Sequence, residues 1–237
     1  MGEINEQVVL TNGTFPRIAP YALFMAFVGL EQLFVHWANN GGGDGSVPAA
    51  MYIYPAKTVA VALLLVTFKS CYTEVCLRDL LKFKHSVISI ISGIVVFILW
   101  INMDWNFTSH PSQQGFNPSI LQDDRMRTSM TFVRMTGAVI IVPIMEELFW
   151  RSFLIRYIIN QTYSKISIGQ FTWPSFLITT IFFGFEHHLL LAGIMAGAAY
   201  NLLLYYSKSI AQCILAHAVT NLALGIYVIT TGQWHFW

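Results

Sequence analysis

Charged residues are scarce in this chain. Asp, Glu, Lys and Arg make up 11% of its 237 residues, whereas 55% are hydrophobic. Soluble domains carry roughly 25% charged residues, and one soluble core of this size cannot absorb so much apolar surface, whereas a lipid bilayer can. The formal net charge of +1 leaves no basic face to neutralise phosphates, which excludes a nucleic-acid binder.

Cysteines are few, and the common hydrolase signatures are absent from the sequence. Cys71, Cys76 and Cys213 are too few and too scattered for a disulfide framework, and no His stands near the first two at zinc-site spacing. The chain has no serine in a nucleophile-elbow pattern, no plausible cysteine nucleophile and no HExxH helix. These absences exclude the usual serine, cysteine and zinc-helix hydrolases.

Apolar runs of about 16–22 residues, the length that a bilayer demands, recur along the sequence. They predict a single all-α domain over residues 1–237, a polytopic membrane helix bundle of about seven to eight transmembrane helices. The predicted spans are 18–37, 51–70, 86–101, 131–159, 174–187, 190–206 and 210–230. The fourth is long enough for a cytoplasmic extension or for a kink around Pro143.

The orientation follows from the basic residues in the loops. Four of them lie at the end of the second predicted span or in the loop after it: Lys69, Arg78, Lys82 and Lys84. The positive-inside rule places that loop in the cytoplasm. Three arginines lie in a loop that should then be external, and they conflict with this orientation: Arg125, Arg127 and Arg134.

The fourth run contains charged side chains, which are costly in a bilayer and are usually kept there for function. Glu147 and Arg151 are spaced i and i+4, so they share a helix face and can pair. Glu146 lies about 100° around the helix from Glu147, so it stays less neutralised and suits a general base. A buried ion pair that only fixes helix packing explains Glu147 with Arg151 equally well, but it leaves Glu146 unexplained.

Two further polar clusters follow. Phe183 and His187 are spaced i and i+4, as are His217 and Asn221. An isolated His is more often a satisfied core or interfacial residue, and we expect His188 and Glu186 to be interfacial. The third cluster can also be an interhelical hydrogen-bond clamp. Together, the clusters supply a carboxylate base, a second proton-handling group and two neutral donors, which are the parts needed to hydrolyse an amide.

The order Glu146-Glu147-x-x-x-Arg151, Phe183-x-x-x-His187, His217-x-x-x-Asn221, each motif on its own hydrophobic run, resembles the type II CAAX prenyl protease (CPBP) family of intramembrane endopeptidases. The similarity covers residues 131–225, a catalytic core that follows the accessory spans of residues 1–130. The layout looks most like a prokaryotic member, which implies a multi-pass protein of the cell membrane. The chain ends at Trp237, so a last span found in some members is expected to be absent.

The resemblance implies a role for each motif residue. Glu146 and His187 would polarise the attacking water, His217 and Asn221 would hold the oxyanion, and Glu147 with Arg151 would orient and tune the first glutamate. Phe183 would contact the substrate, a membrane-anchored protein or peptide that includes lipidated ones. No cofactor and no metal is expected, because the family's glutamate mechanism needs none.

Three alternatives stay open. The same residues can serve a zinc-dependent membrane protease. A non-proteolytic immunity or scaffold protein would use the polar clusters only to lock the bundle. A small transporter would use them as a proton relay, but the first half shows no inverted repeat with broken helices; there Glu31 and His36 are better explained by helix packing or an interfacial position.

Overall fold

The computed structural model describes residues 2–39, 46–103 and 116–237, and within these ranges it contains helices and no strand. The α-helices are α1 (Gly2–Asn39), α2 (Ser46–Thr67), α3 (Phe83–Asn102), α4 (Asp124–Thr136), α5 (Val142–Glu147), α6 (Ile155–Ile159), α7 (Trp173–Phe185), α8 (Leu190–Ser207) and α9 (Ile210–Thr231). The predicted all-α class is therefore confirmed.

Four of the described helices contain a segment that is long and apolar enough to cross a bilayer. These segments are Gly13–Trp37, Phe83–Asn102, Leu190–Ser207 and Ile210–Thr231. Met51–Thr67 and Trp173–Phe185 are apolar but shorter. The helices support an integral membrane protein, and the count of seven to eight spans stays a prediction.

The fourth predicted span is one continuous helix that contains two π-helical segments. Gly137–Ile141 joins α4 to α5, and Leu148–Leu154 joins α5 to α6. Such π segments occur often at functional sites. They flank the short α5, which carries both glutamates, so the kink expected around Pro143 takes the form of a change in helical hydrogen bonding.

Pro143 explains the first of these segments. The N–H of Val142 bonds to the carbonyl of Gly137, five residues back. In the same five-residue register, the next N–H would have to come from residue 143. Because residue 143 is proline and has no N–H, the carbonyl of Ala138 is left without a backbone partner. The side-chain amide of Asn221 donates to that carbonyl at 2.8 Å. Asn221 of the third motif thus compensates for Pro143, which lies three residues before the first motif.

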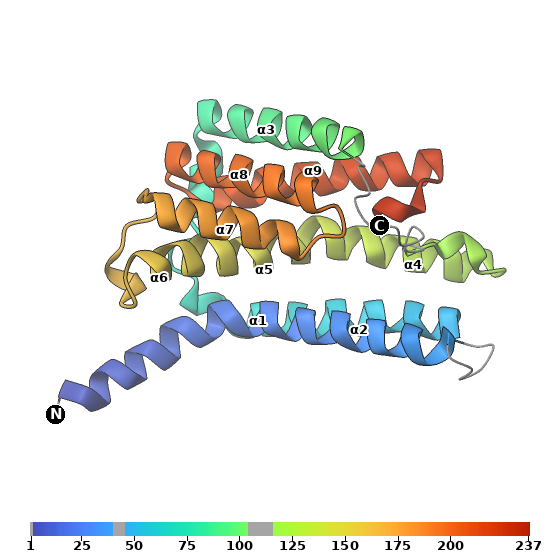
Figure 1. Ribbon diagram of the computed structural model, residues 1–237, viewed down its shortest axis with the longest axis horizontal. Coiled ribbons are helices and arrows are strands. Elements are labelled where there is room, and N and C mark those ends of the chain that lie inside the picture. The colour runs from blue at the N-terminus through green and yellow to red at the C-terminus, as the bar shows by residue number, and fades with distance from the viewer. Residues whose placement is uncertain (1, 40–45, 104–115) are drawn as a thin grey trace.

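The C-terminal helices pack side by side, as Figure 1 shows. Helix α9 lies against α3 and α8, α7 lies against α8, and α9 also contacts the helix that contains α5. Gly93 of α3 allows close approach, because a Cβ there would meet the side chain of Val219 on α9 at 2.9 Å. The hydroxyl of Thr220 donates to the carbonyl of Gly93 at 2.9 Å. The third motif therefore lies on a helix that packs closely against α3.

Helices α1 and α2 form a hairpin that packs mainly against α4, α5 and the two π segments. Pro16 and Pro20 lie inside α1, and the ribbon bends in this region (Figure 1). Because Pro20 has no N–H, the carbonyl of Pro16 lacks its usual partner, and the hydroxyl of Tyr72 donates to it at 2.9 Å. The loop after α2 thereby holds the bent end of α1.

Candidate active site

A cavity of about 320 Å³ lies between the α1–α2 hairpin and the C-terminal helices. Five of the residues singled out in the sequence line it: Glu146, Phe183, His187, His217 and Asn221. Glu147 and Arg151 are buried directly behind it, where Glu147 bonds to His217 and Arg151 packs over the Phe183 ring, both residues of its wall. The three motifs therefore meet at one place, although they come from different helices.

The carboxylate of Glu147 accepts hydrogen bonds from both Arg151 and His217. Its Oε1 accepts from Nη1 of Arg151 at 3.2 Å and from Nδ1 of His217 at 2.9 Å. Arg151 also donates to the Asn201 side chain and to the carbonyl of Gly197 on α8. The predicted i, i+4 ion pair is present. The resemblance assigned Glu147 to the orientation of Glu146, whereas its hydrogen-bonded partner in the third motif is His217.

Glu146 approaches the same imidazole from its other nitrogen. Its Oε2 lies 3.9 Å from Nε2 of His217, and this oxygen is buried without a hydrogen-bond partner among the described residues. The 100° offset between adjacent helix positions lets the two carboxyls take different sides of the ring. An unpartnered buried carboxylate oxygen that faces a cavity is suited to bind a proton donor such as water.

The hydrogen bonding of His187 determines which of its ring nitrogens carries the hydrogen and which can accept one. Its Nδ1 lies 2.7 Å from the carbonyl of Phe183. Because a carbonyl can only accept, Nδ1 carries the hydrogen, and Nε2 of the neutral ring has a free lone pair. Trp100 packs edge-on against this ring, with centroids 5.2 Å apart. Phe183 is 1% exposed, so it forms the cavity wall and supports the imidazole.

Glu186 is a site residue that sequence reasoning missed. We predicted it to be interfacial, but its side chain is only 7% exposed and lines the cavity. Helix α7 ends at Phe185, and the turn that follows returns the carboxyl to the interior. The hydroxyl of Tyr21 on α1 donates to it. Its position directly before His187 was the only available signal, and the contact with α1 cannot be seen in local spacing.

Residues of α8 support the site from behind. Tyr200 stacks on His217 with ring centroids 4.9 Å apart and donates to Thr220 at 2.8 Å. Asn201 is fully buried, and its amide donates to Thr179 at 2.9 Å while its oxygen accepts from Arg151. A polar residue inside the apolar run 190–206 was the signal that could have identified Asn201.

Three cavity residues have the chemistry of metal ligands. One ligand atom each from Glu146, Glu186 and His187 lies within 4.8 Å of the others. Two carboxylates and one imidazole form a set that zinc accepts, with a fourth position left for water. The same spacing also suits one water molecule held by two hydrogen bonds of about 2.8 Å. The geometry therefore fits either species between Glu146 and His187.

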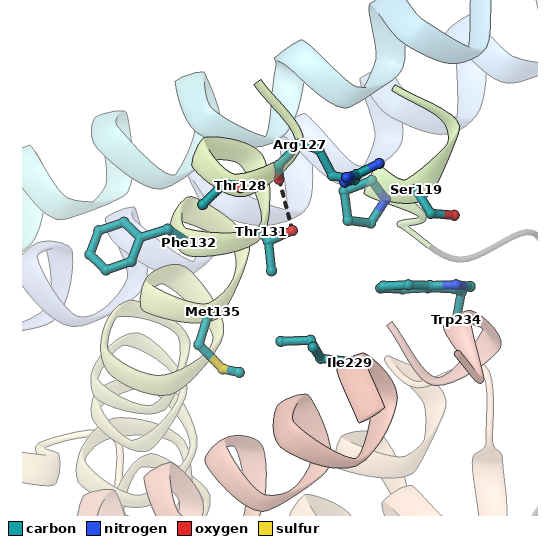
Figure 2. Close-up of a pocket in the computed structure, with 9 residues that line it drawn as sticks. Ser119, Arg127, Thr128, Thr131, Phe132, Met135, Ile229 and Trp234 are labelled. Carbon is teal, nitrogen blue, oxygen red and sulfur yellow. Dashed lines mark hydrogen bonds between the residues drawn. The ribbon is translucent and has the colours of Figure 1, made fainter. Parts of the chain in front are cut away.

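A second hollow, of about 540 Å³, lies between α4 and the end of α9. Figure 2 shows Arg127, Met135, Ile229 and Trp234 around it. Although it is larger, its lining contains no carboxylate, imidazole or thiol. We therefore assign the chemistry to the smaller cavity, where the ionisable groups converge.

Comparison with known proteins identifies the region that carries these residues. Residues 128–223 match the family model described as type II CAAX prenyl endopeptidase Rce1-like. This segment contains the first two motifs, and the third ends at Asn221, inside the match. The match leaves out α1, α2 and α3. No curated protein and no solved structure matches the chain.

Proposed function

We propose that this chain is an intramembrane endopeptidase that cleaves membrane-anchored proteins or peptides, lipidated ones included. The match of residues 128–223 to the type II CAAX prenyl endopeptidase (Rce1-like) family model and the apolar helices support a CAAX-type protease embedded in a membrane. The observation that carries the specific mechanism is the placement of Glu146, with a free carboxylate oxygen, beside both imidazoles in one cavity.

The proposed first step is water activation. A water molecule between Glu146 and the Nε2 of His187 gives its proton to the Glu146 carboxylate while its oxygen attacks the carbonyl carbon of the scissile amide. His187 accepts the second hydrogen of the water as a hydrogen bond, because its Nδ1–H is committed to Phe183. The C–O bond forms, and the carbonyl π electrons move to the oxygen, which becomes an oxyanion.

His217 and Asn221 are placed to receive that oxyanion. With Nδ1 of His217 bonded to Glu147, its Nε2 is the nitrogen left to donate to the oxyanion, which it does when it carries a hydrogen. One N–H of the Asn221 side-chain amide donates to the carbonyl of Ala138, and the second N–H remains to donate to the oxyanion. Donors fixed in this way stabilise the charge that develops in the transition state. Glu147 and Arg151 act as positioning residues behind His217.

Collapse of the intermediate completes the reaction. The oxyanion re-forms the carbonyl, the C–N bond breaks, and the proton held by Glu146 passes to the departing nitrogen. The products are a carboxylic acid and an amine, and Glu146 is returned to its carboxylate form. No oxidant, reductant or covalent intermediate is needed.

The second candidate is a zinc-dependent protease at the same site. The observation that favours it is the triad of ligand atoms from Glu146, Glu186 and His187. In that case the three residues would hold the ion, which would supply Lewis-acid activation of water. The two candidates differ in the role of Glu186, which the metal-free mechanism does not require as a ligand.

Cleavage of membrane-anchored peptides by the purified protein in detergent or vesicles tests the proposal. We expect Glu146→Gln to lower kcat by at least about 10²-fold, because it removes the general base, and we expect a chelator to have no effect. The matched control is Asp124→Asn, since the Asp124 side chain is 81% exposed and pairs with Arg127 at the surface. Chelator inhibition that zinc reverses would favour the metalloprotease. An unchanged rate in Glu146→Gln would disprove both forms of the mechanism at this site, whereas no cleavage by the wild-type protein would favour a scaffold protein.

A further inference from the structure

The α2–α3 loop, which we define as residues 69–84, carries a surface that the proposed chemistry does not use. Three of its large apolar side chains project outward: Leu77, Leu81 and Phe83 are 72%, 83% and 83% exposed. Four exposed basic residues lie among and beside them in the sequence: Lys69, Arg78, Lys82 and Lys84. Large apolar side chains gathered on one exposed segment mark a surface that another apolar surface covers.

The positive charge of the α2–α3 loop is only partly neutralised. Its first carboxylate, Glu74, pairs with Arg17 of α1. Its second carboxylate, Asp79, pairs with Lys82 at 2.8 Å. Within the described ranges of the chain, three cations of the loop have no carboxylate partner: Lys69, Arg78 and Lys84. The loop therefore presents a net positive charge next to its exposed apolar side chains.

Contacts with the helix bundle hold the backbone of this loop in place. The side-chain amide of Gln212 on α9 donates to the carbonyl of Asp79 at 2.7 Å. The hydroxyl of Ser86 on α3 donates to the carbonyl of Leu80 at 2.7 Å, and Tyr72 bonds to α1. The exposed side chains between these contacts therefore project from a fixed backbone, so a partner can bind them without first ordering the loop.

We infer that the α2–α3 loop docks on anionic lipid headgroups of the bilayer around the helices, with its apolar side chains inserted below the phosphates. The exposed apolar surface of both neighbouring helices leads into the loop, through Val66 of α2 and Ile91 of α3. Because α3 is long and apolar enough to cross a bilayer, the loop lies where the chain leaves the hydrocarbon. The inference goes beyond the proposed function and does not depend on it.

A lipid leaflet offers both kinds of contact that this surface needs. Its phosphates accept charge-assisted hydrogen bonds from arginine and lysine, and the acyl chains beneath them cover leucine and phenylalanine side chains. The apolar stems of Arg78 and Lys84 can lie along the same apolar layer while their charged ends reach the headgroups. Clusters of about four to eight lysines and arginines directly beside a membrane span are typical of binding to anionic lipids. A protein partner would have to combine an apolar pocket with an acidic rim to match these side chains.

A fluorophore on Cys76 tests the inference, because this cysteine is exposed and lies directly before Leu77. The protein carries Cys71→Ser, and Cys213 is buried, so the label reports on the loop alone. The protein is reconstituted in phosphatidylcholine vesicles with a rising fraction of either brominated phosphatidylglycerol or brominated phosphatidylcholine, whose bromine atoms quench the fluorophore. We expect half-maximal quenching at a lower fraction of the anionic lipid. Added salt should reduce this preference, because it screens exposed charges.

Substitutions separate the two parts of the surface. Arg78→Gln combined with Lys84→Gln should raise the fraction of anionic lipid at half-maximal quenching about fivefold for each cation removed. Arg125→Gln, an exposed position at the opposite end of the bundle (Figure 1), is the matched control and should leave it unchanged. Leu81→Ser combined with Phe83→Ser should weaken quenching by both lipids, because the label moves towards water. Equal half-maximal fractions for the two lipids, or the same shift in Arg125→Gln, would overturn the inference. No quenching by either lipid would also overturn it, since the loop would then face water and fit a protein partner.

Discussion

At the scale of single residues, the site contains two imidazoles whose Nδ1 atoms have different hydrogen-bond partners. Phe183 fixes the hydrogen on one nitrogen of His187, and Glu147 fixes one nitrogen of His217. Each ring then presents its remaining nitrogen towards the region of Glu146. In the proposed mechanism, Nε2 of His187 accepts from the water, and Nε2 of His217 donates to the oxyanion when it carries a hydrogen.

Glu147→Gln tests the role of His217. The amide keeps the size of the side chain but removes the carboxylate that accepts hydrogen bonds from both Arg151 and His217. We expect kcat to fall by about 10²–10³-fold, the cost of losing one oxyanion donor, while KM changes little. Steady-state kinetics on a membrane-anchored peptide provide the measurement. A normal kcat accompanied only by a lower melting temperature would limit Glu147 to a packing role.

At the scale of secondary structure, local spacing predicted the helical class and one ion pair. Features that depend on contacts between distant segments could not be predicted in this way. The apolar runs identified the all-α class, and the i, i+4 rule identified the pairing of Glu147 with Arg151. The π segments around α5 were not predicted, because they depend on where Pro143 falls and on a donor from α9. Glu186 was misplaced because the turn after α7 cannot be derived from helical periodicity.

The contact between Asn221 and Ala138 yields a prediction about this element. Asn221→Ala leaves a buried carbonyl without a donor, and we expect it to lower the free energy of unfolding by about 1–3 kcal/mol. In a Pro143→Ala background, residue 143 gains an N–H that can bond to Ala138, so the same substitution should cost less. Thermal unfolding of the four proteins in one double-mutant cycle gives the coupling. Strictly additive effects would show that Asn221 does not compensate for the proline.

At the scale of the whole molecule, a polar cluster outside the cavity ties the hairpin to the catalytic helix. Arg17 of α1 donates to both carboxylate oxygens of Glu74, at 2.7 and 2.5 Å. Ser152, next to Arg151, also donates to Glu74. Burial opposes ionisation of Glu74, but the hydrogen bonds from Arg17 and Ser152 outweigh it and lower the pKa of this carboxyl below its ordinary value. No sequence pattern linked these residues, which are far apart in the chain.

The direction of this pKa shift predicts an acid-sensitive stability. A carboxyl with a lowered folded-state pKa stabilises the fold above its unfolded-state pKa, near 4.3. That contribution is lost as the pH falls through the lower folded-state pKa. We expect Glu74→Gln to cost about 3–5 kcal/mol at neutral pH, because Arg17 is left buried and unpaired, and to flatten the loss of stability below about pH 4.3.

Thermal unfolding in detergent between neutral and acid pH measures both effects. Asp124→Asn provides the control, because an exposed ion pair contributes under about 1 kcal/mol. Equal melting temperatures for the wild type and Glu74→Gln at neutral pH would contradict the role of this cluster.

The α1–α2 hairpin supplies one wall of the cavity through Phe24, Met25, Val28, Glu31 and Lys57, yet it lies outside the segment that matches the family. Under the proposed function, the hydrolytic groups and one wall of the substrate cavity are thus encoded in separate stretches of the chain. We then expect mutations in the hairpin to change which substrates fit without disturbing the hydrolytic groups. Selectivity and chemistry are therefore free to diverge at different rates during evolution.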